Sequence, residues 1–233
     1  MRVFKECRYD VYPVLECCVP DPDFSNLKSP NPEDPIAYEL PIKLAKEIDA
    51  DLVTMTDPDG DRVGLACKNR KGDYILLTGN ESAALLMDYI LNERKKKGFL
   101  SVNGVVYNTI VTSSLGSKIA ANYGVKTESF LTGFKYIGDR IQYYEEHGGP
   151  EFEFGYEESY GCLIKPFVRD KDGIQAILLY CEMALYYKQH DITLDEAYHE
   201  LGVKYGFHKT KLFNIAFKGS NGAKKLKILM DTL

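Results

Sequence analysis

Residues 54–64, T-M-T-D-P-D-G-D-R-V-G, place three aspartates at alternate positions in a turn. Asp57, Asp59 and Asp61 come directly after the run A-D-L-V-T-M-T, residues 50–56, which predicts a buried strand. Open α/β sheets bind ligands at the carboxyl ends of their strands, where loops converge. The position of the three aspartates therefore favours a functional loop over an ordinary surface turn.

The chemistry of this turn indicates a divalent metal ion. Carboxylates this close together repel one another unless a cation offsets their charge, and hard divalent ions take oxygen ligands of this kind. Mg²⁺ bound by only three carboxylates keeps positions open for water and phosphate oxygens. We therefore expect Mg²⁺ as the cofactor and phosphoryl chemistry at the site. The forked guanidinium of Arg62 suits a phosphate oxygen or neutralises the aspartates, and both roles can hold at once.

Three other interpretations of the turn compete with a magnesium site. An EF-hand also begins D-x-D-x-D, but it needs Gly at its sixth position and Glu at its twelfth, where this chain has Arg62 and Lys68. A phosphatase with an aspartate nucleophile would use Asp57, but its pattern has Thr or Val where Asp61 stands. A solvated acidic turn is the ordinary interpretation of a single D-x-D, and it explains a third aspartate beside Gly60 and Arg62 less well.

Composition argues against several classes of protein. A net charge of −5 and an isoelectric point near 5.5 give no general attraction to nucleic acid or to an anionic membrane. No apolar run reaches the roughly 18 residues of a membrane span, and the first residues show no signal-peptide pattern. We expect a soluble cytoplasmic protein with no nucleic-acid or membrane partner. The six cysteines include no C-x-x-C pair, which predicts reduced, mostly buried thiols.

Helix signals alternate with short β-branched runs along the chain, a pattern typical of the α/β class. With 233 residues, of which 45% are apolar, the chain is long enough for two cores. We predict two consecutive three-layer α/β/α domains with mixed sheets, over residues 1–100 and 101–215, with the boundary near residues 98–104. Residues 216–233 are predicted to be a linker that ends in an amphipathic helix.

Local signals predict where individual elements begin and end. Asp34 is expected to cap a helix whose first residue is Pro35, and Asn80 to cap a long helix that runs to about residue 97. Residues 104–113 predict a strand, and residues 172–191 predict an apolar helix that is mostly buried.

A second informative stretch is F-G-Y-E-E-S-Y-G-C-L, residues 154–163. It places Glu157, Glu158 and Ser159 between two glycines. Carboxylate and hydroxyl groups on such a loop suit vicinal sugar hydroxyls, which both donate and accept hydrogen bonds. Glu-Glu-Ser also occurs on ordinary surfaces, so this stretch by itself is a weak indication.

Two further loops carry polar groups ahead of predicted helices. L-T-G-F-K-Y-I-G-D-R, residues 131–140, contains a Thr132–Gly133 turn whose backbone N–H groups could receive an oxygen ligand, or that simply caps the helix. V-R-D-K-D-G, residues 168–173, contains Lys171 among acidic residues, and its ordinary interpretation is a solvated turn.

Taken in this order, T-D-P-D-G-D-R, L-T-G-F-K, G-Y-E-E-S-Y-G and R-D-K-D-G closely resemble the motifs of the α-D-phosphohexomutases, the family of phosphoglucomutase and phosphomannomutase. The resemblance covers almost the whole chain, and members of this family have four domains around a cleft. It implies that this chain holds domain II without its beginning (residues 1–100), domain III (101–215) and the connection toward domain IV (216–233). The sugar motif is more similar to phosphoglucomutase and phosphopentomutase members than to mannose-type ones.

The resemblance also implies metal and catalytic roles. Asp57, Asp59 and Asp61 correspond to the Mg²⁺ ligands of the family, and Arg62 to a neighbour of the transferring phosphoryl group. Lys171 matches a lysine proposed as a general acid or base in glucose-type members.

The sugar-binding residues follow in the same way. Thr132 and Gly133 are implied to line the sugar site, while Glu157 and Ser159 are implied to hold ring hydroxyls, with Glu158 pointing elsewhere. The implied reaction passes phosphate from a phosphoserine to a hexose monophosphate and returns the other phosphate of a 1,6-bisphosphate. The expected ligands are glucose 1-phosphate, glucose 6-phosphate and glucose 1,6-bisphosphate.

The chain departs from the family pattern in two respects. It contains no serine loop of the T-A-S-H-N-P kind, since Ser113, Ser114 and Ser117 lack the following His-Asn-Pro and are expected to cap a helix. It also lacks an arginine-bearing phosphate loop. We therefore expect a fragment of a phosphohexomutase that is inactive alone. The alternative is a non-catalytic paralogue that binds sugar phosphate and magnesium with the same loops.

Overall fold

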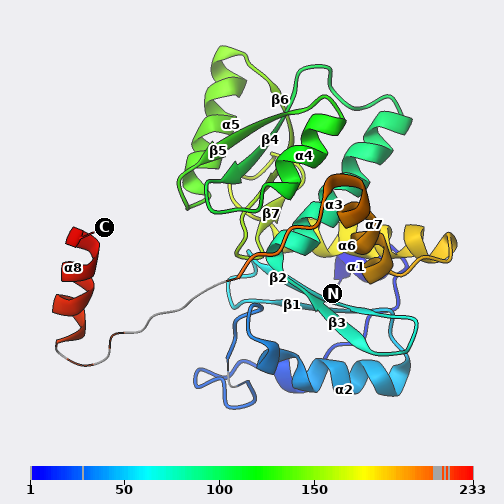
Figure 1. Cartoon of the computed structure of the whole chain (residues 1–233). Helices are drawn as coiled ribbons and strands as arrows, with labels where there is room; N and C mark the ends of the chain where they lie inside the picture. Colours follow the sequence, from blue (N-terminus) through cyan, green and yellow to red (C-terminus); the bar gives the residue numbers. More distant parts are fainter. Residues whose placement is uncertain (1, 28, 212–216, 218, 220, 233) are drawn as a thin grey trace.

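The computed structural model in Figure 1 describes residues 2–27, 29–211, 217, 219 and 221–232. Two sheets form its centre. The first is antiparallel, in the order β1-β2-β3, and the second has the order β5-β4-β6-β7, with β4 parallel to β5 and β6, and β7 antiparallel to β6. The strands are β1 (Leu52–Thr56), β2 (Val63–Lys68), β3 (Tyr74–Leu77), β4 (Gly104–Thr109), β5 (Lys126–Phe130), β6 (Glu151–Tyr156) and β7 (Cys162–Leu163).

Helices surround both sheets. The α-helices are α1 (Arg2–Glu6), α2 (Glu39–Ile48), α3 (Gly79–Lys96), α4 (Leu115–Asn122), α5 (Lys135–His147), α6 (Gly173–Gln189), α7 (Leu194–Tyr205) and α8 (Gly222–Thr232), and the 3₁₀ turns are η1 (Leu15–Cys17) and η2 (Pro35–Tyr38). The amphipathic helix predicted at the end of the chain is present as α8, which stands apart from the two sheets in Figure 1. Parts of the predicted ranges 101–215 and 216–233, namely residues 212–216, 218, 220 and 233, lie outside the described residues.

The alternation of side chains along the strands produces three layers at each sheet. In β4, Val105 and Tyr107 pack with α5, whereas Val106 belongs to the cluster that contains α3 and α4. In β2, Ala66 packs with α2, whereas Leu65 faces the side covered by α6. The predicted α/β class with layered sheets is confirmed, and its first sheet is antiparallel because β1, β2 and β3 are joined by hairpins.

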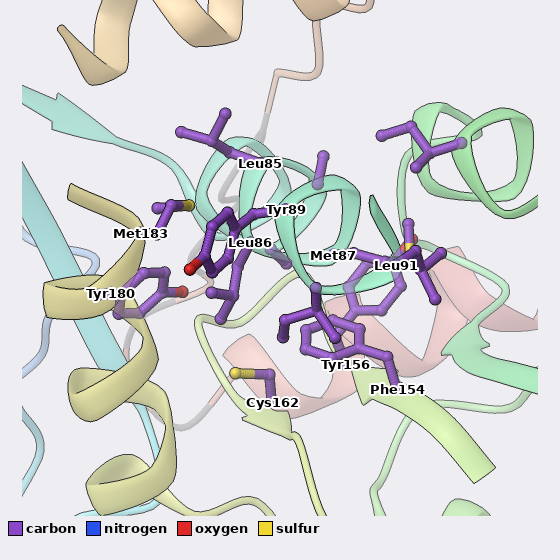
Figure 2. Close-up of a cluster of buried hydrophobic side chains, with 14 of the residues drawn as sticks. Leu85, Leu86, Met87, Tyr89, Leu91, Phe154, Tyr156, Cys162, Tyr180 and Met183 are labelled. Atoms are coloured by element: carbon purple, nitrogen blue, oxygen red, sulfur yellow. The ribbon is translucent and has the colours of Figure 1, made fainter. Parts of the chain in front are cut away.

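One shared core joins the two sheets, and α3 is its centre. Figure 2 shows α3 with side chains directed both toward α6 and toward β6. The same cluster includes β2 residues, so that both sheets contribute to it. Its side chains shown in Figure 2 include Leu85, Leu86, Met87, Tyr89 and Leu91 of α3, Phe154 and Tyr156 of β6, Cys162 of β7, and Tyr180 and Met183 of α6. This shared burial holds the loops of one sheet against the loops of the other.

The predicted helix starts are right in one case and wrong in the other. The Asp34 carboxylate accepts the Ile36 N–H at 3.1 Å, as expected for a cap before Pro35, although the first turn is 3₁₀. Asn80 does not cap α3. Thr78 does so in a capping box with Glu81, while the Asn80 side chain accepts the Ser113 N–H at 2.9 Å and ties α3 to the loop after β4.

Two other predicted elements differ from the structure. The strand predicted over residues 104–113 ends at Thr109, because the chain turns after Ile110 donates its N–H to the Phe130 carbonyl at the end of β5. The helix α6 is not mostly buried: Ile174 and Leu185 are 58% and 47% exposed, since packed elements cover only one of its sides. The six cysteines are free as predicted, but only Cys67 and Cys162 are buried.

Within the described part of the chain, no helix is long and apolar enough to cross a membrane.

A buried ion pair fastens the end of α3 to the second sheet. Arg94 donates to Glu153 Oε2 at 2.6 Å and to the Ile164 carbonyl at 3.2 Å, while Glu153 Oε1 accepts the Ser101 N–H at 2.8 Å. The Glu153 side chain is only 4% exposed. Its carboxylate therefore depends on Arg94 for compensation of its charge.

Replacement of Arg94 by Met is expected to lower the free energy of unfolding by about 3–5 kcal/mol, because the buried Glu153 carboxylate would lose its cation. Lys96→Met on the same helix is the matched control. The Lys96 side chain is half-exposed and contacts Glu93 and the Tyr186 hydroxyl, and the loss of these exposed contacts is expected to cost less than about 1 kcal/mol. Urea denaturation of both variants measures the difference, and equal losses would contradict the structural role of the buried pair.

Candidate functional site

The three aspartates lie together in the hairpin loop between β1 and β2, residues 57–62, which we call the metal loop. One carboxylate oxygen from each of Asp57, Asp59 and Asp61 lies within 4.8 Å of the others. Asp57 is buried, Asp61 half-buried and Asp59 exposed, so the cluster opens toward solvent on one side. Gly60 has φ +74°, a conformation that L side chains rarely adopt, and allows the loop to reverse between the antiparallel strands.

Arg62 neutralises Asp57 from within the same loop. Its backbone N–H donates to Asp57 Oδ1 at 3.1 Å and its Nε to Oδ2 at 2.5 Å. Burial opposes ionisation of Asp57, but these hydrogen bonds outweigh it and hold the pKa of the carboxyl below its usual value. Of the two roles considered for Arg62, neutralisation of an aspartate is therefore the one present in this structure.

Two further residues hold the Arg62 guanidinium. Its Nη1 lies 3.5 Å from Asn31 Oδ1 and 3.5 Å from Glu33 Oε1. Neither residue was expected at the site, since both precede Arg62 by about thirty positions. The segment around them is rich in proline, and its one predicted feature, the helix cap at Asp34, does not indicate a contact with Arg62.

The loop of residues 157–161, which we call the sugar loop after the role expected for it from the sequence, packs directly on the metal loop. The Val63 N–H donates to the Tyr160 carbonyl at 2.8 Å, and Arg62 and Gly161 form an isolated antiparallel β-bridge. The Gly60 carbonyl also accepts the N–H of Gly173, the first residue of α6, at 3.1 Å. Loops about one hundred residues apart in sequence thus form one site.

Glu157 is held at the bottom of the sugar loop. Its side chain is 9% exposed, its Oε1 accepts the Gly133 N–H at 2.9 Å, and its Oε2 lies 3.4 Å from Lys171 Nζ. The Thr132–Gly133 turn therefore binds a carboxylate of the protein through its N–H group. Thr132 itself is exposed and Ser159 is half-buried.

Glu158 anchors the sugar loop to the end of β4. Its Oε2 accepts the hydroxyl of Thr109, the last residue of β4, at 2.9 Å. Beneath the loop lies Gly79, where an added Cβ would be 2.1 Å from the Glu158 carbonyl oxygen. Only glycine allows this close approach between α3 and the loop. The sequence offered no signal for Thr109 or Gly79 as supports of this loop.

Lys171 lies between the two loops. Its Nζ is 3.0 Å from Asp61 Oδ2, 3.0 Å from Asp170 Oδ1 and 3.4 Å from Glu157 Oε2. Burial favours the neutral amine, but the hydrogen bonds to Asp61 and Asp170 outweigh it and raise the pKa of the ammonium above its usual value. Lys171 is therefore charged at neutral pH, with its ammonium stabilised by Asp61 and Asp170.

Burial raises the pKa of Asp61, and the charges of Asp57 and Asp59 contribute in the same direction, despite the hydrogen bond from Lys171. Burial is the larger cause of this shift, and the two aspartates add to it. The carboxylates at this site also outnumber its two cations, Arg62 and Lys171. A divalent cation would offset this excess. An oxygen-only donor set with one accessible carboxylate fits Mg²⁺.

Two family models match the chain. "Phosphoglucomutase/phosphomannomutase, alpha/beta/alpha domain II" matches residues 1–72, and the corresponding model of domain III matches residues 78–205. The helix α3 falls within the second match. The boundary near residues 98–104 stays a prediction from the sequence.

Curated relatives agree with the family models. A phosphoglucomutase from Staphylococcus epidermidis is 39% identical over 219 residues, which cover 93% of this chain and 39% of the relative. A phosphoglucomutase from Staphylococcus aureus (strain N315) is 36% identical over 230 residues, which cover 98% of this chain and 41% of the relative. The chain thus spans about two fifths of the length of these relatives.

Solved structures support the fold. A putative phosphomannomutase from Thermus thermophilus superposes with a TM-score of 0.60 at 21% identity, covering 77% of this chain and 36% of that one. The open form of pp63/parafusin, a phosphoglucomutase from Paramecium, gives a TM-score of 0.59 at 23% identity, covering 82% of this chain and 32% of that one. With both family models matched in order, the chain belongs to the phosphoglucomutase/phosphomannomutase family.

Proposed function

We propose that this chain supplies the metal loop and the sugar loop of a magnesium-dependent phosphohexomutase. The intact enzyme would interconvert hexose 1-phosphate and hexose 6-phosphate in the cytoplasm through a phosphoserine and a 1,6-bisphosphate. The observation that carries the proposal is the contact of one ammonium, that of Lys171, with both Asp61 and Glu157. The proposed metal ligand and the proposed sugar ligand are thereby close enough to act on one sugar phosphate.

Asp57, Asp59 and Asp61 would hold Mg²⁺ by their carboxylate oxygens. When bound, the metal would offset negative charge on the phosphoryl group during transfer. Arg62 keeps Asp57 ionised and in place, and its guanidinium would bind an oxygen of the phosphoryl group. Positioning and electrostatics would thus supply most of the catalysis by these residues.

Glu157 and Ser159 would bind ring hydroxyls of the sugar, with Thr132 and Gly133 at its edge. The Glu157 carboxylate is fixed from two directions by Gly133 and Lys171, so little side-chain freedom would be lost when a hydroxyl binds. Lys171, being charged, would give a proton to an oxygen of the sugar phosphate rather than remove one. The names of the curated relatives favour a glucose phosphate as the substrate.

No T-A-S-H-N-P loop occurs in the 233 residues. We infer that the serine which donates the phosphoryl group belongs to another part of the intact protein, and that activity belongs to the whole.

The metal assignment predicts that Asp59→Asn lowers the Mg²⁺ affinity of the chain by about tenfold or more, because one of three charged ligands becomes neutral. Calorimetric titration measures the affinity, which is expected to be weak without the phosphoserine. Asp73→Asn, in the exposed turn between β2 and β3, removes the same charge outside the site and should change little. Equal affinities for the two variants would count against the metal loop.

The sugar assignment predicts that Glu157→Gln weakens the binding of glucose 1-phosphate by about tenfold, since a hydrogen bond to a charged acceptor is replaced by one to a neutral group. A titration followed by NMR detects such weak binding. Glu151→Gln, at the exposed start of β6, is the matched control. If Glu157→Gln bound the sugar phosphate as well as the control does, the sugar loop would have another role.

The chain alone is expected to convert no measurable glucose 1-phosphate to glucose 6-phosphate, because it lacks the phosphoserine loop. Coupling glucose 6-phosphate formation to its oxidation by a dehydrogenase provides the assay. Turnover by the chain that disappears in Asp59→Asn would show that these residues need no further part of the protein.

A further inference from the structure

The Lys171 side chain is mostly buried and makes contacts along its whole length. Its side chain is 11% exposed, and its ammonium lies 5.2 Å from the centre of the Phe134 ring. Its aliphatic stem lies on Gly161, where an added Cβ would be 2.0 Å from Lys171 Cδ. These contacts hold the ammonium between the metal loop and the sugar loop.

The contact of Lys171 with Asp61 competes with metal binding. Asp61 Oδ2 lies 3.0 Å from Lys171 Nζ, and its Oδ1 faces Arg62 Nε at 3.9 Å. Both oxygens of this carboxylate therefore face positive charges that belong to the protein. A divalent cation that takes Asp61 as a ligand must replace or share one of these contacts.

Of the two cations, Lys171 is the one that can release Asp61. Arg62 is joined to Asp57 through both its backbone and its side chain, so its position is set by its own loop. Lys171 reaches the metal loop from the loop before α6 and keeps two carboxylates, those of Asp170 and Glu157, when it leaves Asp61. Its charge would therefore remain compensated after the change of partner.

We propose that Lys171 is the internal counter-cation of the metal loop: it neutralises Asp61 while no divalent cation is bound and yields Asp61 to the metal when one binds. This role rests on the proposed metal site, but it is distinct from proton transfer because it precedes any chemistry. It makes metal affinity weaker than the three aspartates alone would provide. It also links metal occupancy to Glu157, since Lys171 shifts its remaining hydrogen bonds toward the sugar loop.

The test is calorimetric titration of the chain and its variants with Mg²⁺. Lys171→Met removes the competing charge and keeps the apolar stem, and it is expected to tighten Mg²⁺ binding on the order of tenfold, as for loss of a unit charge about 5 Å from a divalent ion when water screens the interaction. Lys171→Arg keeps the charge and should bind within about threefold of the unaltered chain. Lys188→Met, which removes an exposed lysine paired with Asp51, controls for the change in net charge and should have no effect.

The outcomes separate this proposal from the proposed function. If Lys171→Met binds Mg²⁺ no more tightly than the unaltered chain, or does not bind it, the counter-cation role is wrong. If binding is nevertheless lost in Asp59→Asn, the metal site stands without that role. If Asp59→Asn leaves binding unchanged in both the natural and the Lys171→Met backgrounds, the metal loop is not the site and both proposals fail. Lys171→Gln serves as a second neutral variant, and circular dichroism confirms that each variant is folded.

Discussion

Repulsion among three crowded carboxylates is the constraint on which the arrangement of this site depends. Asp57, Asp59 and Asp61 have oxygens within 4.8 Å of one another, and negative charges at such separations are unfavourable without nearby cations. One cation, Arg62, comes from the same loop and binds Asp57. The other, Lys171, reaches Asp61 from the loop before α6. The metal loop is therefore stabilised only when both sheets are in place.

The packing of the two sheets therefore determines whether Lys171 lies close enough to neutralise Asp61. Apolar side chains of α3, β6 and α6 form one core with residues of β2. Hydrophobic burial is non-directional, so it does not determine how the two sheets are oriented relative to each other. Specific backbone contacts determine this orientation. The approach of Gly79 to the Glu158 carbonyl and the hydrogen bond from Gly173 to Gly60 determine which loop surfaces meet. The Arg94–Glu153 pair fastens the far end of α3.

Much of the fold followed from local patterns, and the errors occurred where a distant partner decided the outcome. The strand before the aspartates and the cap at Asp34 were predicted because their signals lie within a few residues. Thr78 rather than Asn80 caps α3, since Asn80 is engaged by Ser113 of another loop. The strongly apolar sequence of α6 predicted that it is mostly buried, but its neighbours cover only one side.

For the site, the sequence by itself determined which chemical groups are present: three aspartates in one turn, a Glu-Glu-Ser loop and a lysine among acidic residues. Their spacing along the chain was enough to indicate a metal site, because the three carboxylates are local neighbours. Only the tertiary structure decided that Lys171 lies between Asp61 and Glu157, that Gly133 holds Glu157, and that Asn31 and Glu33 hold Arg62. These contacts join residues from distant parts of the chain, and their geometry arises from the packing of the two sheets around α3, which no local pattern encodes.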